Sequence, residues 1–207
     1  MIAHPLWRSP APLVLASNSA ARRVLLQEAG IPVEVSPAPI DERAVEAPLR
    51  AAGAAPEAVA AHLAAAKARA VALRHPGRLV LGADQVLALG DEMFTKPEDR
   101  AAARRHLGRL ADRAHALHAA LCLMRDDTVV FETVSTARLT MRPLSDAFLD
   151  AYLEAEGDAV CGSVGAYRLE GIGIHLFSRI EGDQPTILGL PLLALLPALR
   201  QAGVLLG

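Results

Sequence analysis

The lysines of this chain are the first residues whose chemistry stands out. The sequence has 21 lysines and arginines together, and only Lys67 and Lys96 are lysines. Arginine replaces lysine readily on solvated surfaces, but not where a compact ammonium must fit beside a phosphate or a metal-bound water. Both lysines are therefore candidates for neutralising a polyphosphate. The alternative is drift under a composition that favours arginine.

The acidic candidates follow predicted strands. Asp84 ends the apolar run RLVLGA, and Asp41 and Glu42 follow a strand predicted over 33–36. Ligand and metal groups collect at the C-terminal ends of strands in α/β folds. Hydrolysis of a polyphosphate needs a hard divalent cation, carboxylates that hold it, an activated water and cationic side chains. For Asp41 and Glu42, an exposed acidic turn is the alternative.

A polar turn precedes the first predicted helix. Ser17, Asn18 and Ser19 follow the apolar run PLVLA, and Arg22 lies one turn into the helix. Hydroxyls and free backbone N–H groups at a helix N-terminus form a phosphate site, to which an arginine adds bidentate donors. The alternative is that Ser19 is an ordinary N-cap and Arg22 a solvated helix residue.

The elements that must position these residues mix strand and helix. Lys67 falls on the alanine face of a helix predicted from Pro56 to about Arg74, one turn after Leu63, so we expect it to be partly buried and paired. The other predicted elements are strands at 12–16, 33–36, 78–83 and 173–180, a hairpin at 85–95, an antiparallel pair at 115–124 and 128–140, and helices at 22–29, 97–110 and 145–156. Between 157 and 173 we expect a loop and a short strand. These elements predict a mixed α/β fold in one domain, residues 1–207.

Composition excludes several classes of protein. A net charge of −2 and an aromatic content of 3% disfavour nucleic acid as a partner. Cys122 and Cys161 have no spacing typical of zinc sites or disulfide frameworks, which suits a reducing compartment. The first twelve residues lack a signal-peptide pattern, and the apolar segment 187–199 is too short to span a bilayer and is expected to be a buried helix with its entry. We therefore expect a cytoplasmic protein with a small-molecule substrate.

Taken in order, these segments resemble the Maf family, first named for effects on septum formation and regarded as nucleotide pyrophosphatases. The resemblance covers nearly the whole chain through six motifs in the family's order. They are LVLASNSAARRVLL, IPVEVSPAPIDE, AAAKARAV, VLGADQVLALGDEMFTKP, GAYRLEGIG and RIEGDQPTILGLPL. The resemblance implies hydrolysis of a nucleoside triphosphate to its monophosphate and pyrophosphate.

The resemblance also implies roles for individual residues. It implies catalytic roles for Asp84, with Asp84 as proton acceptor, and for Lys67 and Lys96, and a divalent cation (Mg²⁺, Mn²⁺ or Co²⁺) on Glu42 and Asp84. The substrate-binding residues it implies are Ser17, Ser19, Arg22, Ala21, Gln85 and Glu170. It further implies an elongated, two-lobed α/β fold like that of inosine triphosphate pyrophosphatases, and a homodimer.

The chain departs from the family pattern at a few positions. Ala20 and Ala21 stand where the family often has proline and arginine. Thr95 replaces the glycine of the GKP turn, and Ser163 stands near a place where many members have lysine. We expect these departures to affect rate and substrate preference more than reaction type.

Three positions separate two branches of the family. The branch that cuts dTTP and UTP typically has arginine, threonine and glutamine, whereas the branch that resembles 7-methyl-GTP pyrophosphatases has a large residue, glutamine and glutamate. This chain has Ala21, Gln85 and Glu170, so two of three favour the second branch. A carboxylate can accept hydrogen bonds from the N–H groups of a guanine edge, whereas uracil and thymine offer one N–H between two carbonyls. A surface strand residue outside the pocket is the alternative for Glu170.

Two non-enzymatic hypotheses stand beside the pyrophosphatase. One is a regulator of septum formation that binds nucleotide or protein without turnover, and the other is a phosphate-binding structural module. Loss of Lys67, Lys96 or Asp84 would favour the regulator, and a structural module would not need the acids. All three residues are present, which favours the enzyme.

Overall fold

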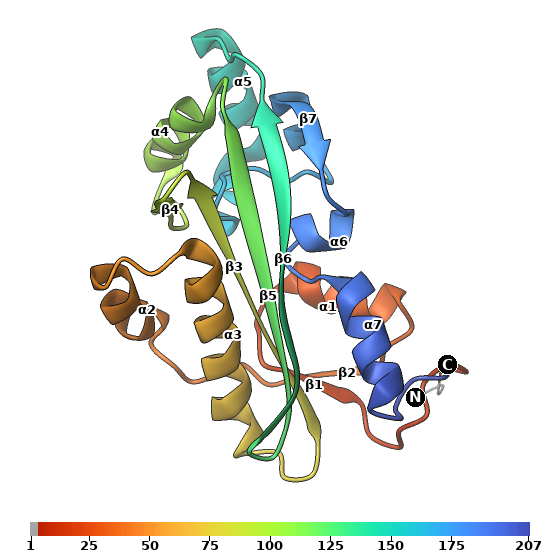
Figure 1. Cartoon of the computed structure of the whole chain (residues 1–207). Helices are drawn as coiled ribbons and strands as arrows, with labels where there is room; N and C mark the ends of the chain where they lie inside the picture. Colours follow the sequence, from red (N-terminus) through yellow and green to blue (C-terminus); the bar gives the residue numbers. More distant parts are fainter. Residues whose placement is uncertain (1–3) are drawn as a thin grey trace. The chain divides into compact units, whose positions relative to one another are not determined.

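The computed structural model describes residues 4–207 and contains a mixed sheet of seven strands with helices packed on it (Figure 1). The sheet order is β2-β1-β3-β5-β6-β7, and β4 pairs with β3. The strands are β1 (Leu13–Leu15), β2 (Val33–Val35), β3 (Leu79–Leu89), β4 (Glu92–Phe94), β5 (Ala114–Arg125), β6 (Thr128–Met141) and β7 (Phe177–Glu181). The predicted mixed α/β fold is confirmed. Residues 1–3 of the N-terminal segment lie outside the described residues.

The helices come between and after these strands. They are α1 (Ala20–Glu28), α2 (Glu42–Ala51), α3 (Pro56–Ala72), α4 (Arg100–Leu110), α5 (Asp146–Glu156), α6 (Gln184–Ile187) and α7 (Leu192–Gln201), with 3₁₀ helices η1 (Gly157–Gly162) and η2 (Ile172–Leu176). Within residues 4–207, no helix has the length and apolar character that crossing a membrane requires.

The chain forms two compact units. The first unit contains the described residues up to Gln85, together with His118–Ser135 and Asp183–Gly207. The second unit contains Val86–Leu117 and Thr136–Gly182. Strands β3, β5 and β6 each contribute one part to each unit.

The first unit is built around parallel strands. β1 pairs in parallel with β2 on one side and with β3 on the other, with Leu15 opposite both Val35 and Leu81. Every residue of β1 is buried, which is usual for a strand between two parallel neighbours. Because β1 and β3 run in the same direction, the turn after Leu15 lies beside the part of β3 that follows Leu81, and the amide of Ala16 donates to the carbonyl of Leu81 at 2.9 Å. The sequence therefore brings the turn after β1 and the acid on β3 to one place.

Helix α3 packs very closely on β3. At Gly82, an added Cβ would lie 2.0 Å from the carbonyl oxygen of Ala64 and 2.7 Å from the amide nitrogen of Ala68. Only glycine permits this approach, and the small side chains of the alanines of α3 leave room for the strand to lie close to the helix. The close approach holds the Lys67 turn of α3 against the part of β3 that carries Asp84.

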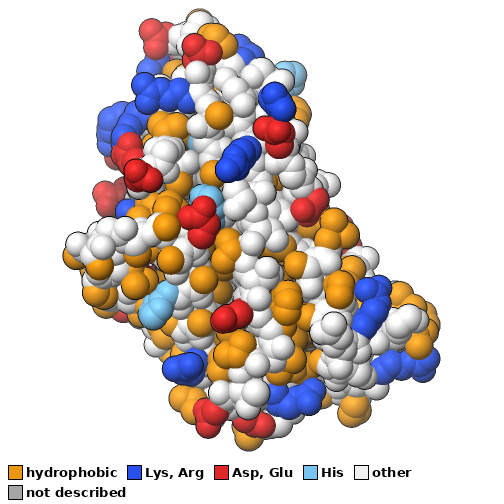
Figure 2. All heavy atoms as spheres, in the orientation of Figure 1, with side chains coloured by type: hydrophobic (Ala, Val, Ile, Leu, Met, Phe, Trp, Pro, Cys, Tyr) orange, Lys and Arg blue, Asp and Glu red, His pale blue; other side chains and the backbone are white. Residues whose placement is uncertain are grey.

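The outer side of α3 carries a different set of side chains. A hollow of about 420 Å³ is lined by His62, Ala65, Ala66, Arg69 and Ala70. Figure 2 shows hydrophobic side chains among a few charged ones over this part of the molecule. Lys67 instead contacts Asp84 on β3, so the polar site lies on the side of α3 that faces β3.

Two helix starts depend on side-chain caps that the sequence analysis did not use. Residues 42–51 form a helix for which no element was predicted, because Asp41 accepts a hydrogen bond from the amide of Ala44 and caps it. Helix α4 begins at Arg100 and not at Pro97, because Asp99 is its N-cap. The buried helix with its entry that was expected over 187–199 is confirmed, since α7 is that helix and Gly189, whose φ is 85°, lies in the entry before it.

The region between 157 and 180 also differs from the prediction. The short strand expected before residue 173 is absent, since the described residues there form η1, a turn and η2. The strand that follows begins only at Phe177. Glu170 therefore lies on a turn and not on a strand.

The second unit has a buried histidine among aromatic rings. His115 Nε2 lies 2.8 Å from the hydroxyl of Tyr167, and Phe177 packs on both rings. His115 Nδ1 is buried without a hydrogen-bond partner among the described residues. Burial lowers the pKa of His115 from 6.5 to about 4, so the folded protein holds this side chain neutral.

We predict that His115 destabilises the protein as the pH falls from 7 to 5. The unfolded imidazole binds a proton near pH 6.5 while the folded one does not, so the free energy of unfolding should fall by about 1 to 2 kcal/mol on this account. Urea denaturation of wild type and His115→Asn at both pH values measures the effect. The variant should show the smaller fall, and equal falls would contradict the prediction.

Candidate active site

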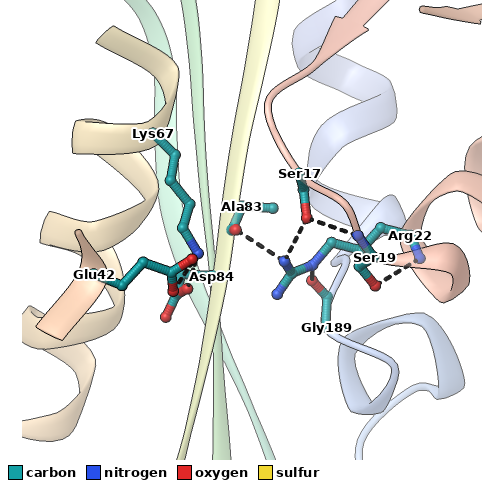
Figure 3. A network of polar contacts seen from close by, with 8 residues as sticks. All are labelled: Ser17, Ser19, Arg22, Glu42, Lys67, Ala83, Asp84 and Gly189. Carbon is teal, nitrogen blue, oxygen red and sulfur yellow. Dashed lines mark hydrogen bonds and ion pairs between the residues drawn. The ribbon is translucent and has the colours of Figure 1, made fainter. Parts of the chain in front are cut away.

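The centre of the candidate site is Lys67, which lies between two carboxylates (Figure 3). Its Nζ is 2.6 Å from Asp84 Oδ1 and 2.8 Å from Glu42 Oε2. Lys67 and Asp84 are each only 6% exposed, whereas the Glu42 side chain is 55% exposed. The prediction that Lys67 is buried with a charged partner is confirmed.

Three separate elements supply this cluster. Lys67 projects from α3, where side chains lean toward the helix N-terminus. Asp84 lies on β3 directly after the fully buried Ala83, and Glu42 is the first residue of α2, next to the Asp41 cap. Asp41 itself is used in capping, so Glu42 is the member of the acidic pair that reaches the cluster.

The cluster carries one positive and two negative charges. A buried ammonium has a high desolvation cost, which Asp84 and Glu42 offset by direct ion pairing. One negative charge remains formally uncompensated within the cluster. This excess favours a further cation at the exposed side, where Glu42 lies.

The two carboxylates suit a hard divalent cation. Magnesium in phosphate-processing sites is commonly held by one or two carboxylates together with phosphate oxygens and waters. Among residues 4–207, no group of three or more His, Cys, Asp or Glu side chains is arranged to hold a metal ion. Asp84 and Glu42 are the residues that could hold such a cation together with phosphate oxygens and waters.

The turn after β1 forms the second part of the site. Ser19 caps α1 by accepting a hydrogen bond from the amide of Arg22, and the amide of Ser19 donates to Ser17 Oγ. This turn leads into the positive end of the α1 dipole. The N-cap alternative for Ser19 is thus what the structure has, and it is compatible with a phosphate site.

Arg22 is buried and connects this turn to β3 and to the chain near the C-terminus. Its Nη1 donates to Ser17 Oγ at 3.1 Å and to the carbonyl of Ala83 at 3.0 Å, and its Nε donates to the carbonyl of Gly189 at 2.8 Å. Burial lowers the pKa of Arg22, while the negative charges of Asp84 and Glu42 raise it. The alternative that Arg22 is a solvated helix residue is wrong.

The turn around α6 contacts the residue that follows Asp84, and sequence reasoning missed its role. Gln85 Nε2 donates to the carbonyls of Thr186 and Ile187 at 3.1 and 3.0 Å. Asp183 caps α6 through the amide and the hydroxyl of Thr186. The acceptors here are main-chain carbonyls, which carry no sequence signature. Gly189 before a Leu-Pro pair is the signal that could have indicated a turn.

The remaining predicted residues have different positions. Ala21 is half-buried in the first turn of α1. Lys96 is exposed between β4 and α4 in the second unit. Glu170, also in the second unit, lies on the turn before η2 with its Oε1 3.7 Å from Arg168 Nε. The roles of Lys96 and Glu170 stay predictions.

The site consists of buried Lys67, its two carboxylate partners Glu42 and Asp84, and the turn at the N-terminus of α1. These groups are suited to binding a phosphate-bearing anion. The Maf family model, described as Maf-like protein, matches residues 12–202, and the chain therefore belongs to the Maf family.

Two relatives that match this chain along its length carry pyrophosphatase names. The chain is 53% identical to a protein of Nitrobacter hamburgensis named nucleoside triphosphate pyrophosphatase, over 97% of this chain and 98% of that one. It is 52% identical to a protein of Rhizobium etli named 7-methyl-GTP pyrophosphatase, over 94% and 98%. A crystal structure of a dITP/XTP pyrophosphatase from Mycobacterium abscessus aligns with 72% of this chain and 96% of its own at 19% identity, with a TM-score of 0.37. The predicted enzyme class, a hydrolase of the pyrophosphatase type, is confirmed.

We predict that Lys67 and Asp84 contribute to stability as a coupled pair. Lys67→Met should lower the free energy of unfolding by about 3 to 5 kcal/mol, because it leaves a buried carboxylate without a counter-charge. Adding Asp84→Asn should recover part of this loss, and urea denaturation of both single variants and the double variant measures the coupling. Lys96→Met, at an exposed position, is the control and should change little. Strictly additive effects of Lys67→Met and Asp84→Asn would exclude the coupling.

Proposed function

We propose that this protein is a nucleoside triphosphate pyrophosphatase that prefers 7-methyl-GTP and releases 7-methyl-GMP and pyrophosphate. The reaction class is supported by membership of the Maf family and by the names of relatives that match this chain along its length. The observation that carries the proposal is the buried Lys67 between Asp84 and Glu42. Arg22 connects the strand that carries Asp84 to the turn at the start of α1.

Different residues of the first unit are proposed to have different roles in hydrolysis. The N-terminus of α1 offers main-chain N–H groups and a favourable dipole to phosphate oxygens. Lys67 is proposed to offset charge that develops on the phosphates, and Lys96 is proposed to add a second positive charge. The electrostatic stabilisation from each charge is largest in a site from which water is excluded. Water is excluded around buried Lys67.

Asp84 is proposed to accept the proton of the attacking water. The water oxygen forms a bond to the α-phosphorus, the anhydride bond between the α- and β-phosphates breaks, and pyrophosphate leaves with the electron pair of that bond. Asp84 is held by Lys67 Nζ, which fixes the orientation of its carboxylate. A divalent cation held by Glu42 and Asp84 would supply positive charge to the phosphate oxygens.

The preference for 7-methyl-GTP rests on Glu170. Its carboxylate can accept hydrogen bonds from the N1–H and the N2 amino group of guanine, and it would repel the two carbonyls of uracil or thymine. Methylation of N7 adds positive charge to the base and improves this match. A relative named 7-methyl-GTP pyrophosphatase is 52% identical to this chain, which supports the proposal.

We predict that Asp84→Asn reduces kcat at least a thousandfold, since it removes the proton acceptor while keeping the shape of the side chain. Release of pyrophosphate from 7-methyl-GTP with Mg²⁺, Mn²⁺ or Co²⁺ is the measurement. Asp91→Asn, on the exposed β3–β4 turn, is the matched control and should retain wild-type turnover. Near-native turnover by Asp84→Asn would refute the role of Asp84, and a wild type that binds nucleotide without turnover would support the regulator.

We also predict that kcat/KM for 7-methyl-GTP exceeds that for dTTP and UTP by about tenfold to a hundredfold, as expected for one hydrogen-bonding mismatch in a pocket. Glu170→Gln should reduce this ratio toward one, because an amide donates and accepts and so no longer repels the pyrimidine carbonyls. Glu154→Gln, on the exposed side of α5, should leave the ratio unchanged. A wild-type preference for dTTP or UTP would overturn the substrate assignment while the reaction class stands.

A further inference from the structure

We propose that Arg168 is a positioning residue that holds the carboxylate of Glu170 in place for the nucleotide base, and that Glu156 anchors Arg168. The inference rests on the proposed function, in which Glu170 accepts hydrogen bonds from guanine. It deepens that function by adding two residues to the specificity of the site. All the contacts that carry it lie within the second unit.

The first observation is a row of three charged side chains. Arg168 Nε lies 3.7 Å from Glu170 Oε1 and 4.0 Å from Glu156 Oε2. The side chain of Glu156, at the end of α5, is only 8% exposed, whereas those of Arg168 and Glu170 are 48% and 41% exposed. A largely buried carboxylate needs a counter-charge at close range, so Glu156 is the fixed end of the row. Arg168 connects this fixed end to the accessible carboxylate of Glu170.

The second observation is that the backbone before Arg168 is held by side chains. Ser163 Oγ accepts from the amide of Tyr167 at 3.1 Å and donates to the carbonyl of the same residue at 2.8 Å. The hydroxyl of Tyr152, which lies on α5, donates to the carbonyl of Ala166 at 3.3 Å. The chain is thus tied to α5 immediately before Arg168.

The third observation is the tight turn that carries both Arg168 and Glu170. At Gly173, an added Cβ would lie 2.3 Å from the carbonyl oxygen of Arg168, so only glycine fits there. The amide of Gly171 donates to the carbonyl of Arg168 at 3.2 Å. An added Cβ at Gly171 would lie 3.5 Å from Glu156 Oε1 and 3.6 Å from Arg168 Nη2, which places both charged groups against this turn. The position of Glu170 is therefore coupled to that of Arg168.

The charges of the row explain why both Arg168 and Glu156 are needed. The row has two negative charges and one positive charge. Because Glu156 offsets the charge of Arg168, the charge of Glu170 stays available to a cationic base such as 7-methylguanine. Arg168 uses only part of the acceptor capacity of Glu170, since a carboxylate has about four lone-pair sites. Arg168 can therefore orient Glu170 without taking the place of the base.

The first test uses Arg168→Met, which removes the guanidinium and keeps an unbranched side chain. It should lower kcat/KM for 7-methyl-GTP about tenfold, through KM, and change that for dTTP less than about threefold, because only guanine donors lose their acceptor. Arg168→Lys, which keeps the charge, should recover part of the loss. Arg179→Met is the matched control, because Arg179 is another exposed arginine that pairs with a glutamate, and it should change neither value. Equal losses for both nucleotides would show a general structural effect and overturn the proposal.

A double variant separates action through Glu170 from an independent effect of Arg168. If Arg168 acts through Glu170, adding Arg168→Met to Glu170→Gln should change the ratio of the two kcat/KM values less than about twofold. A further tenfold fall of this ratio would show that Arg168 acts on the base without Glu170, contrary to the proposal.

The anchoring role of Glu156 has its own variant. Glu156→Gln leaves the charge of Arg168 to offset Glu170 alone, so the preference for 7-methyl-GTP over GTP should fall by about threefold or more. Glu154→Gln, an exposed position on the same helix, is the control and should leave this preference unchanged. An unchanged preference in Glu156→Gln would exclude Glu156 as the anchor.

An NMR measurement on the nucleotide-free protein decides the pairing without turnover. The Nε–H signal of Arg168 should move in Glu170→Gln and in Glu156→Gln, and should stay in place in Glu181→Gln, whose carboxylate pairs with Arg179. A signal that does not move in Glu170→Gln would refute the proposal. If wild type shows no preference for 7-methyl-GTP, the proposed substrate fails, and this signal still decides whether Arg168 holds Glu170.

Discussion

The ion cluster of Lys67, Asp84 and Glu42 is the interaction on which the rest of the site depends. A buried ammonium needs counter-charge at contact distance, and the two carboxylates come from a strand and from a different helix. Their meeting requires α3 to lie close on β3, which the absence of a side chain at Gly82 permits. The fold and the charge cluster therefore constrain each other, and a change in either should disturb both.

A second network depends on main-chain carbonyls. Arg22 donates to the carbonyls of Ala83 and Gly189, and Gln85 donates to two carbonyls of the α6 turn. Carbonyl oxygens have fixed positions once the backbone is set, so they orient long side chains more firmly than other flexible side chains would. Arg22 is therefore held in a buried position, where burial lowers its pKa and the negative charges of Asp84 and Glu42 raise it.

The division of the chain into two units separates the proposed tasks. The described first unit contains the groups proposed to bind phosphate and activate water, whereas Lys96 and the proposed base-reading Glu170 belong to the second. Members of one family can share phosphate chemistry and differ in the base they prefer when these tasks lie in different parts of the chain. The relatives that match this chain are named both for nucleoside triphosphates in general and for 7-methyl-GTP.

The sequence by itself determined the local features of this protein. The Ser19 cap, the buried Lys67 on an alanine face, the apolar run before Asp84 and the order of the family's motifs all depend on residues a few positions apart, where periodicity and capping chemistry are visible. The strand predicted to end before Asp84 in fact continues to Leu89. Only the tertiary structure decided that Arg22 is enclosed, that Glu42 and not Asp41 reaches Lys67, and that Gln85 holds the α6 turn. These contacts join residues far apart in the chain, and their acceptors are often backbone oxygens, which every residue type presents alike.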